Sequence, residues 1–473
     1  MPFKPVVLWT DALLFLLLAS AIAFWWHARA RPHLRRPWTK LAGSSRGMAS
    51  LVFIGFFLVV GLLDSVHFRE RIAGEGSSQQ FAAQTRSLLD AIVGPLGSRT
   101  EKTYSAPLAT HLFAKETVEL ADGARVRTYP RLRYGGAHLS DPASEWQADV
   151  LRTAIAGLGV AAILWNVLAL AVTALVARRS QRSFTRSWHA IWHGLEAVPW
   201  RAILCSAGVL ILLLAPLAVL STKYHVLGTD KVGQDVFYLT LKSIRTGLLI
   251  ATLSTLVMLP LATALGIMAG YFRGWVDDII QYVYTTLNSI PGVLLIAAAV
   301  LMLQVYMGTH PEVFDTIEQR QDLRLLFLCL ILGVTSWTGL CRLLRGETLK
   351  LREQEYVQAA RAFGVSHVSI ISRHILPNVM HIILIAVVMD FSGLVLAEAV
   401  LSYVGVGVDP TMTSFGNMIN AARLEMAREP MVWWSLASAF VFMLMMVLSA
   451  NLFADAVRDA FDPRVNGNGR EHA

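Results

Sequence analysis

About nine apolar runs, separated by charged or Gly- and Pro-containing segments, constrain the fold of this chain more than any other feature. A helix needs roughly 20 mostly apolar residues to cross the hydrocarbon of a bilayer. In lipid, a helix also satisfies every backbone N–H and C=O group within its own segment. The sequence therefore predicts an all-α polytopic membrane protein with about nine transmembrane helices, near residues 8–26, 48–63, 151–176, 202–220, 247–271, 287–306, 325–340, 379–400 and 432–453.

Composition supports this class of protein and excludes others. Of the 473 residues, 55% are hydrophobic and 16% are charged, and the mean hydropathy is +0.52, which excludes an ordinary soluble domain. The net charge of +8 could suggest nucleic acid as a partner. Because Lys and Arg gather in the cytoplasmic loops of membrane proteins, the excess needs no such partner, and we expect contact with membrane lipid and not with nucleic acid.

Basic clusters predict the orientation of the chain in the membrane. The loops 27–47 and 177–201 are rich in Arg, which places them in the cytoplasm. Alternation from these loops places the N-terminus and residues 64–150 outside, and segment 341–378 and the C-terminus in the cytoplasm. Segment 341–378 is itself basic, with Arg342, Arg345, Lys350, Arg352, Arg361 and Arg373.

The first apolar run, 8–26, has a second interpretation as a cleaved signal peptide. Ala19, Ala21 and Ala23 supply the small residues that a cleavage site needs. Two observations oppose the signal-peptide interpretation. Lys4 is the only charged side chain before the run, and the main basic cluster follows the run instead of preceding it. We therefore favour a retained helix.

The polar segment 355–377, EYVQAARAFGVSHVSIISRHILP, lies between two apolar runs. Residues 355–363 predict one short helix, and Gly364 is placed to end it in a left-handed conformation. Residues 365–375 predict a second short helix, which Pro377 closes. The segment is thus expected to form a compact knob on the cytoplasmic membrane face.

This segment resembles the EAA loop of binding-protein-dependent ABC importers. That pattern is Glu-Ala-Ala, three residues, Gly, nine residues, then Ile-x-Leu-Pro. The residues in register here are Ala359, Ala360, Gly364, Leu376 and Pro377. Gln358 and His374 depart from it, since the family usually has Glu and Ile there. The resemblance implies that the knob is a coupling helix that seats in a groove of a cytoplasmic ATPase, where Glu355 either accepts hydrogen bonds from the ATPase or caps its own helix.

Further blocks of the same kind occur in order between about residues 225 and 464. They are HVLGTDKVGQDV, LGIMAGYFRGWVDD, RHILPN, LAEAVLSYVGVGVDP, SFGNMI and DAVRDAFDPR. Together they resemble the C-type permease subunit of dipeptide, oligopeptide and nickel ABC importers. The resemblance implies a multi-pass permease of the bacterial inner membrane, most simply for peptides. Its implied partners are a second, B-type permease subunit, two ATPase subunits and an extracytoplasmic solute-binding protein.

The resemblance also divides the chain. A six-helix permease core is expected at 202–464, with the coupling loop at 341–378 and a polar tail at 465–473. Before it we expect two helices with a basic cytoplasmic loop (1–63), an extracytoplasmic insert (64–150), and a third helix with a cytoplasmic interfacial segment (151–201). The family's usual subunit has a short N-terminus, so these three helices and the insert are a departure.

One segment superficially begins a phosphate-binding loop, because Gly228 is followed after four residues by Gly233. The next residues are Gln234 and Asp235 rather than Lys and Ser or Thr, so the cation for the phosphates is missing. We therefore expect no nucleotide, catalytic residue or cofactor in this chain, and ATP and Mg²⁺ in separate ATPase subunits.

Two other groups of residues are candidates for the transport mechanism. Gly266, Gly270 and Gly274 recur at a spacing that lets transmembrane helices approach closely. Asp390 and Glu398 are ionisable residues in or near the eighth run, and such residues are candidates for a substrate path. The histidines form no ligand cluster, and the three cysteines lack CxxC spacing, so no metal site is expected.

Two other functions remain open at this stage. An ion-coupled secondary transporter working alone would show inverted repeats, which are not apparent, and would have no use for a coupling loop. A membrane-anchored sensor with a ligand-binding insert would leave the six-helix core unexplained. Within the permease family, nickel-chelate import is the alternative to peptide import.

Overall fold

The computed structural model describes residues 3–29, 32–72, 80–82, 85–119, 125–310 and 316–461, so the predicted tail 465–473 lies outside the described residues. Within this part, eight helices are long and apolar enough to cross a membrane. The all-α polytopic fold predicted from the apolar runs is thereby confirmed. The described chain forms two compact units, built from 3–6, 38–246 and 413–452 and from 7–37, 247–412 and 453–461.

The spanning helices coincide with the predicted runs. They are α3 (Ser45–Ser65), α5 (Pro142–Ser180), α7 (Trp200–Leu220), α8 (Val236–Phe272), α10 (Gly292–Thr309), α11 (Ile317–Ser336) with α12 (Thr338–Arg352), α15 (Leu376–Tyr403) with the turns before it, and α17 (Trp434–Phe461). The first run forms α1 (Trp9–Arg29), whose apolar part, Trp9–Ala23, is shorter. The short helix α2 (Pro32–Gly43) follows it.

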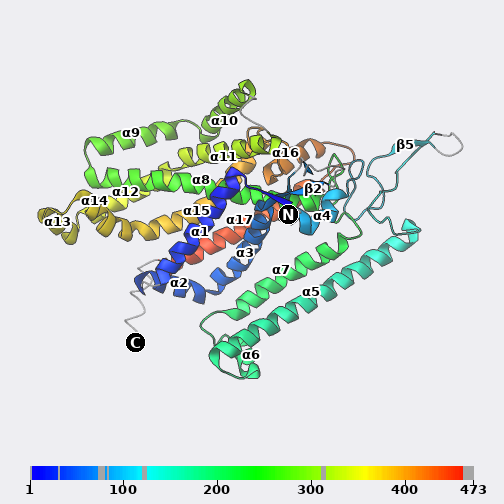
Figure 1. The fold of residues 1–473 in the computed structure, drawn as a ribbon, viewed down its shortest axis with the longest axis horizontal. Coiled ribbons are helices and arrows are strands. Elements are labelled where there is room, and N and C mark those ends of the chain that lie inside the picture. Colours follow the sequence, from blue (N-terminus) through cyan, green and yellow to red (C-terminus); the bar gives the residue numbers. More distant parts are fainter. Residues whose placement is uncertain are drawn as a thin grey trace. The chain divides into compact units, whose positions relative to one another are not determined.

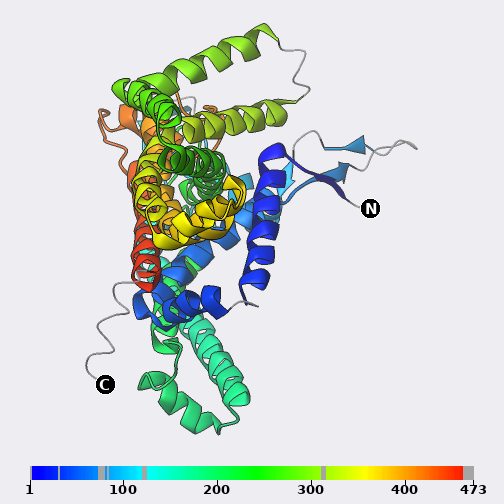
Figure 2. The same cartoon turned by 90° about the vertical axis from the view of Figure 1, so that its left-hand side faces the viewer.

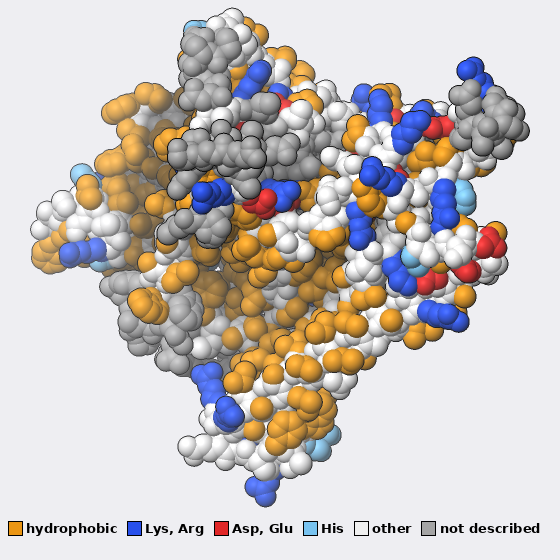
Figure 3. Space-filling model, turned by 45° about the vertical axis from the view of Figure 1, so that its right-hand side comes forward, with side chains coloured by type: hydrophobic (Ala, Val, Ile, Leu, Met, Phe, Trp, Pro, Cys, Tyr) orange, Lys and Arg blue, Asp and Glu red, His pale blue; other side chains and the backbone are white. Residues whose placement is uncertain are grey.

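In the first unit, α5 and α7 pack as an antiparallel pair joined through α6 (Phe184–Trp192), as Figure 1 shows. Small residues allow their close approach. A Cβ on Gly157 would lie 2.6 Å from the Cα atom of Pro216, and Gly208 lies under the indole of Trp165. The outward sides of both helices carry exposed Leu, Ile and Val side chains, which suits a lipid-facing surface and contributes to the apolar areas in Figure 3.

The predicted insert contributes small sheets to the same unit. Strand β2 (His67–Ile72) pairs antiparallel with β1 (Phe3–Val6), β3 (Gln80–Phe81) and β4 (Arg86–Ser87), and Figure 2 shows β1 next to the N-terminus. Helix α4 (Leu88–Ser98) follows and starts with a capping box at Ser87. Strands β5 (Glu116–Glu119) and β6 (Arg125–Thr128) form an antiparallel hairpin. Helix α16 (Phe415–Glu425) also belongs to this unit.

The second unit has a continuous core formed by the ends of α8, α12 and α15. It also contains α9 (Trp275–Ser289), an amphipathic helix in a stretch where no element was predicted. The buried face of α9 presents Ile280 and Tyr284 to the core. Asp277 accepts two hydrogen bonds from Arg345 of α12, at 2.6 and 2.7 Å, and this bidentate pairing lowers the pKa of Asp277.

Helix α1 packs on α11 in this unit, although it comes from the N-terminal part that the permease resemblance does not cover. Buried Asp322 of α11 accepts hydrogen bonds from the backbone N–H groups of Trp9 and Thr10 and from the Thr10 hydroxyl. A carboxylate at a helix N-terminus satisfies free N–H groups and complements the helix dipole. The first turn of α1 therefore lies beside the second turn of α11.

Candidate functional site

The segment 355–377 begins with helix α13 (Glu355–Ala362), as predicted. Gly364 has a φ of +72°, and its N–H donates to the carbonyl of Arg361 while the N–H of Val365 donates to that of Ala360. These two bonds form a Schellman motif, the usual end of a helix at a left-handed glycine. A Cβ at Gly364 would meet no atom within 4 Å, so backbone conformation alone makes glycine favourable here.

The second half of the segment differs from the prediction. Helix α14 (His367–Ile370), a π-helical turn (Ile371–Ile375) and α15 follow one another without a break, so Pro377 does not close a separate short helix. Proline removes one N–H, and its ring clashes with the carbonyl four residues earlier in a regular α-helix. The wider π turn lies directly before Leu376 and Pro377, where it accommodates the proline. The knob is thus a bent extension of α15.

Four fully buried side chains anchor the knob to its own unit: Val357, Ile370, Ile375 and Val379. They pack with residues of α8 and α12 in the main core of that unit. Tyr271, at the end of α8, also contacts the knob. Its hydroxyl lies 2.8 Å from His367 Nδ1, and its carbonyl accepts a hydrogen bond from Arg352. Sequence reasoning missed Tyr271, although it lies within the LGIMAGYFRGWVDD block.

The two residues that depart from the family pattern have local partners. Gln358 Nε2 lies 3.2 Å from the carbonyl and 3.5 Å from the carboxylate of Glu353, which also pairs with Arg273 at 2.8 Å. A Glu at 358 would bring a second carboxylate to Glu353, whereas an amide donates to it. The His374 ring lies 6.0 Å from the Tyr356 ring, centroid to centroid.

Asn378 adds to the contact between Tyr356 and His374. Its side-chain amide donates to the Tyr356 hydroxyl, at 3.2 Å, and to the His374 carbonyl, at 2.6 Å. Tyr356 belongs to α13 and Asn378 to α15, so the two arms of the knob are braced against each other. The arms therefore form one rigid piece.

The exposed surface of the knob is partly apolar. Phe363 is 87% exposed and Val368 is 77% exposed, which is unusual for apolar side chains beside a buried core. Ala359 is exposed, but Ala360 packs against the core of its own unit. Glu355 is exposed in the first turn of α13. Phe363 and Val368 were missed from sequence, where their apolar character in a polar segment was the available signal.

The predicted glycine face is divided by the structure. Gly266 and Gly270 lie against α12, because added Cβ atoms would be 2.8 Å from the carbonyl oxygens of Cys341 and Arg345 respectively. Gly274 lies beyond the end of α8, has a φ of +60° and precedes α9. Two glycines therefore permit close packing of α8 on α12, whereas the third forms a turn.

The two acidic residues of α15 have different surroundings. Glu398 is buried and accepts a hydrogen bond from Ser402, one turn later, at 2.8 Å. Asp390 is half-buried near the middle of α15, and no residue in the described ranges pairs with it or donates a hydrogen bond to it. Its neighbours Met389 and Gly393 are exposed. These surroundings distinguish Asp390 as the accessible carboxylate.

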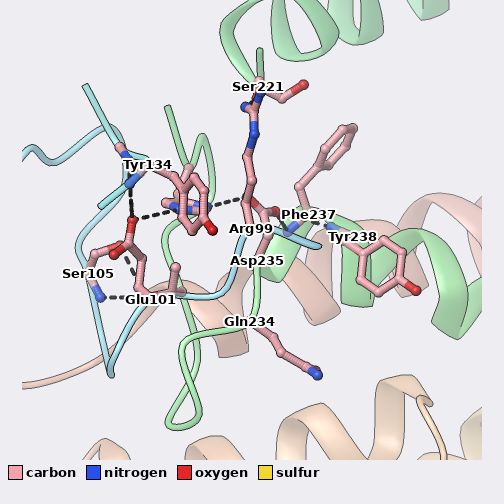
Figure 4. A network of polar contacts seen from close by, with 12 residues as sticks. Arg99, Glu101, Ser105, Tyr134, Ser221, Gln234, Asp235, Phe237 and Tyr238 are labelled. Carbon is pink, nitrogen blue, oxygen red and sulfur yellow. Dashed lines mark hydrogen bonds and ion pairs between the residues drawn. The ribbon is translucent and has the colours of Figure 1, made fainter. Parts of the chain in front are cut away.

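A second polar site lies in the first unit, where the insert meets the α7–α8 loop. His225 Nδ1 lies 2.7 Å from Asp235 Oδ2, and His225 Nε2 lies 3.4 Å from Glu101 Oε1. Glu101 also accepts hydrogen bonds from the backbone N–H groups of Arg133, Tyr134 and Gly135 (Figure 4). We call Glu101, His225 and Asp235 the polar clamp.

Electrostatics stabilise the charged form of the clamp. Burial opposes ionisation of Glu101, but the hydrogen bonds from His225 and the backbone outweigh it and lower the pKa of Glu101 to about 2. Burial likewise disfavours protonated His225, but the hydrogen bonds that the ring donates to Asp235 and Glu101, and the attraction of their negative charges, raise its pKa to about 9. A histidinium is thus held between two carboxylates.

Glycines and a tryptophan complete this junction. Gly228 and Gly233, which superficially begin a phosphate-binding loop, both have positive φ values. A Cβ on Gly233 would lie 1.9 Å from the Glu101 carbonyl oxygen, and one on Gly228 would lie 2.5 Å from that of Ser105. The Trp434 indole donates to the carbonyl of Thr229. The glycines therefore make room for the insert backbone.

The eight spanning helices of the described residues, with the knob between α12 and α15, define a polytopic membrane protein. The model of the family described as "Binding-protein-dependent transport system inner membrane component" matches residues 262–467. The oligopeptide transport system permease protein OppC of Mycobacterium tuberculosis is 33% identical over 239 residues, which are 50% of this chain and 76% of that protein. The chain belongs to this family of inner-membrane permease components of binding-protein-dependent importers.

A second relative is also a transport permease. The glutathione transport system permease protein GsiD of Pectobacterium atrosepticum is 33% identical over 241 residues, which are 51% of this chain and 73% of that protein. A solved structure described as inward facing conformations of the MetNI methionine ABC transporter has a TM-score of 0.38 and 16% identity, and covers 48% of this chain and 98% of that chain. The permease component of such an importer is not itself catalytic.

Proposed function

We propose that this permease subunit imports peptides and couples to cytoplasmic ATPase subunits through residues 355–377. The names of similar permeases, for oligopeptide, dipeptide and glutathione transport, support a peptide substrate. In this proposal two ATPase subunits bind ATP and Mg²⁺, a B-type permease completes the membrane part, and a solute-binding protein delivers the peptide. One knob per chain supplies one ATPase seat, which is the reason for a second permease.

The observation that carries the coupling proposal is the contrast within the knob. Its inner face is fully buried at Val357 and Ile370, while Phe363 and Val368 project from the outer face. Exposed apolar groups on a rigid support are typical of protein-docking surfaces, and a preformed surface loses little entropy on binding. Because the knob extends α15, a displacement of its seat would tilt that helix.

The N-terminus is proposed to lie outside and the C-terminus in the cytoplasm. Strand β1 pairs with β2 of the insert, so the chain start and the insert share one side of their unit. The insert is the longest polar segment between spanning helices, and the Arg-rich stretches 177–201 and 341–378 follow an odd number of crossings after it. This arrangement supports the orientation predicted from charge.

Asp390 is proposed to line the substrate path. An unpaired carboxylate facing lipid would be costly, so its half-buried position on α15 favours a water-filled path in the assembled importer. There it would attract the protonated amino terminus of a peptide. Exchange of Asp390 for Asn should raise the apparent KM for peptide uptake, whereas exchange of buried Glu398 for Gln should act through stability. Unchanged uptake kinetics in the Asp390 variant would contradict the path role.

The coupling proposal is tested with the double variant Phe363→Ala/Val368→Ala in the full chain. We expect normal membrane insertion but loss of ATPase subunits on purification in detergent, because the variant removes about 1.5–3 kcal/mol of burial per side chain. The matched control is Phe184→Ala, which truncates another exposed phenylalanine, in α6. Retention of ATPase subunits by the double variant would contradict the proposed seat.

A further inference from the structure

The insert carries an alternating row of arginines. Residues 125–133 read RVRTYPRLR, with four arginines and no acidic residue. Successive side chains of a strand point to opposite sides, so Arg125 and Arg127 of β6 lie on the same side, and Arg131 and Arg133 follow beyond the end of the strand. This stretch lies outside the part of the chain that the family model matches. We call these four residues the arginine ridge.

The four arginines are exposed, and so are Val126, Thr128 and Tyr129 between them. Leu132, in contrast, is 4% exposed. Arg127 pairs in register with the uncharged Thr117 of β5, whereas Glu119 lies opposite Arg125. Lys115 adds a further positive charge, with its ammonium 5.4 Å from the centre of the Tyr129 ring. The ridge is therefore a positively charged surface supported by buried leucine.

A hollow of about 370 Å³ lies beside the ridge and is lined in part by Lys102, Glu116, Arg131 and Arg133. Its two carboxylates already have partners. Glu116 pairs with Lys102 at 2.6 Å, and Glu101 belongs to the polar clamp. Arg131 donates to the carbonyls of Gly136 and Leu139, which fixes its side chain at the rim. The hollow therefore offers arginine N–H groups to an incoming carboxylate.

The clamp holds the end of the ridge at Arg133. Glu101 accepts hydrogen bonds from the backbone N–H groups of Arg133, Tyr134 and Gly135. The N–H of Leu132 donates to the carbonyl of Thr110. In Figure 3, Lys and Arg side chains are spread over the right-hand part of the surface. A charged surface that is already ordered before binding loses little entropy when a partner docks.

The position of the ridge favours a water-soluble partner over lipid headgroups. The polar first turns of α5, residues 142–150, precede its apolar run and rise about 13 Å along the helix axis. A headgroup layer is only about 5–7 Å thick. Figure 1 shows β5 beyond the N-terminal end of α5, at the end away from α6. The ridge thus lies above the membrane surface, where screening by salt limits attraction to lipid.

We propose that the arginine ridge and its hollow form a docking surface for an acidic patch of the solute-binding protein. This inference rests on the proposed function, because it requires the insert to lie outside and a binding protein to deliver substrate. Arginine recognises carboxylates with paired N–H groups, and complementary charge accelerates encounter between proteins. The insert thereby adds a contact for the binding protein to the surface of the permease core.

The test uses the full chain with its partner subunits in lipid nanodiscs and the purified solute-binding protein of the same transport system. The variant is Arg127→Glu/Arg133→Glu, which reverses charge but spares Arg131 and all backbone bonds. We expect the Kd for the binding protein to rise about tenfold at about 50 mM salt, with a smaller effect at about 300 mM. The matched variant Arg127→Lys/Arg133→Lys keeps the charge and should retain most of the affinity.

The outcomes separate this inference from the proposed function. Equal Kd values for wild type and the Glu variant overturn the docking surface while leaving the importer assignment intact. Absence of ATPase subunits from the purified wild-type complex contradicts the proposed function instead. An effect seen only in discs of phosphatidylglycerol, and not in discs of phosphatidylcholine, assigns the ridge to anionic lipid and also overturns the docking surface.

Discussion

The knob at 355–377 and the clamped insert are the two regions that we propose bind partner proteins, and they are stabilised in opposite ways. The knob rests on fully buried apolar residues such as Val357 and Ile375 and presents Phe363. The insert is joined to the α7–α8 loop by buried charges at Glu101 and His225 and presents arginines. We therefore propose that the knob, which is held by packing, recognises its partner by shape, and that the insert, which is held by a polar network, recognises its partner by charge.

This difference has consequences for how each region responds to change. The contribution of apolar packing to the free energy of unfolding falls gradually as atoms are removed. A buried charge that loses its partner, in contrast, lowers the free energy of unfolding strongly. Hydrophobic contacts also have little dependence on pH, but the clamp contains two groups with shifted pKa values. The two regions should therefore respond differently to substitution and to pH.

The largest effect is expected from Glu101→Ala, which breaks the clamp. Three backbone N–H groups and the buried His225 imidazolium lose their carboxylate, so the free energy of unfolding of the insert should fall by about 3–5 kcal/mol. Hydrogen exchange of the amides at 133–135 measures the loss. The control is Glu116→Ala, which removes an exposed ion pair with Lys102 and should cost about 0–1 kcal/mol. Equal effects of the two substitutions would contradict a special role of the clamp.

The second prediction concerns pH. The pKa of His225 is raised from 6.5 to about 9, so its stabilisation is complete below pH 6.5 and is lost as the pH rises through 9. The pKa of Glu101 is lowered from 4.5 to about 2, so its stabilisation is complete above pH 4.5 and is lost as the pH falls through 2. The insert should therefore be most stable between pH 4.5 and pH 6.5, where both contributions are complete.

Limited proteolysis of the insert across this pH range measures the effect. Cleavage within 99–136 should accelerate towards pH 9, while the knob should show no matching change. In His225→Gln the alkaline acceleration should disappear, because no imidazolium is left to lose its proton. If the variant kept the wild-type alkaline profile, another group would be responsible.

A smaller effect is expected from Gly364→Val, which breaks the helix end in the knob. The left-handed conformation costs a non-glycine residue about 1–2 kcal/mol. That cost would lower the population of the folded knob by about 5- to 30-fold, with normal membrane insertion and reduced transport. Gly346→Val is the matched control, since a Cβ there also meets no atom within 4 Å but Gly346 has no positive φ. Transport equal to that of the control would contradict the role of Gly364.

The smallest effect is expected from Gln358→Glu, which restores the residue usual in the family. It places a carboxylate next to Glu353 and should destabilise the knob by about 0.2–0.5 kcal/mol. The second substitution Glu353→Gln should cancel the loss in a double-mutant cycle of thermal unfolding. Additive effects of the two changes would show that the contact between residues 353 and 358 carries no energy.

Much of the fold could be predicted from sequence because its dominant signal is local. An apolar run of sufficient length becomes a helix in lipid whatever surrounds it, and eight of the nine predicted runs coincide with spanning helices of the described residues, while the run 8–26 forms the shorter apolar part of α1. Gly364 was predictable in the same way, since a glycine after a helical pattern marks its end. Helix α9 was missed because its Asp277 looks like a loop residue until Arg345 is placed beside it.

The sequence by itself determined the membrane class, the helix positions, the family resemblance and the place of the knob. All of these depend on hydropathy, short-range backbone preferences or an ordered motif within one stretch of chain. Only the tertiary structure decided that Pro377 lies within a bent, continuous helix. It also showed that the Gln358 amide donates a hydrogen bond to Glu353, which gives a reason for glutamine at this position. It alone brought Glu101 to His225, because a charge pair 124 residues apart has no local pattern to reveal it.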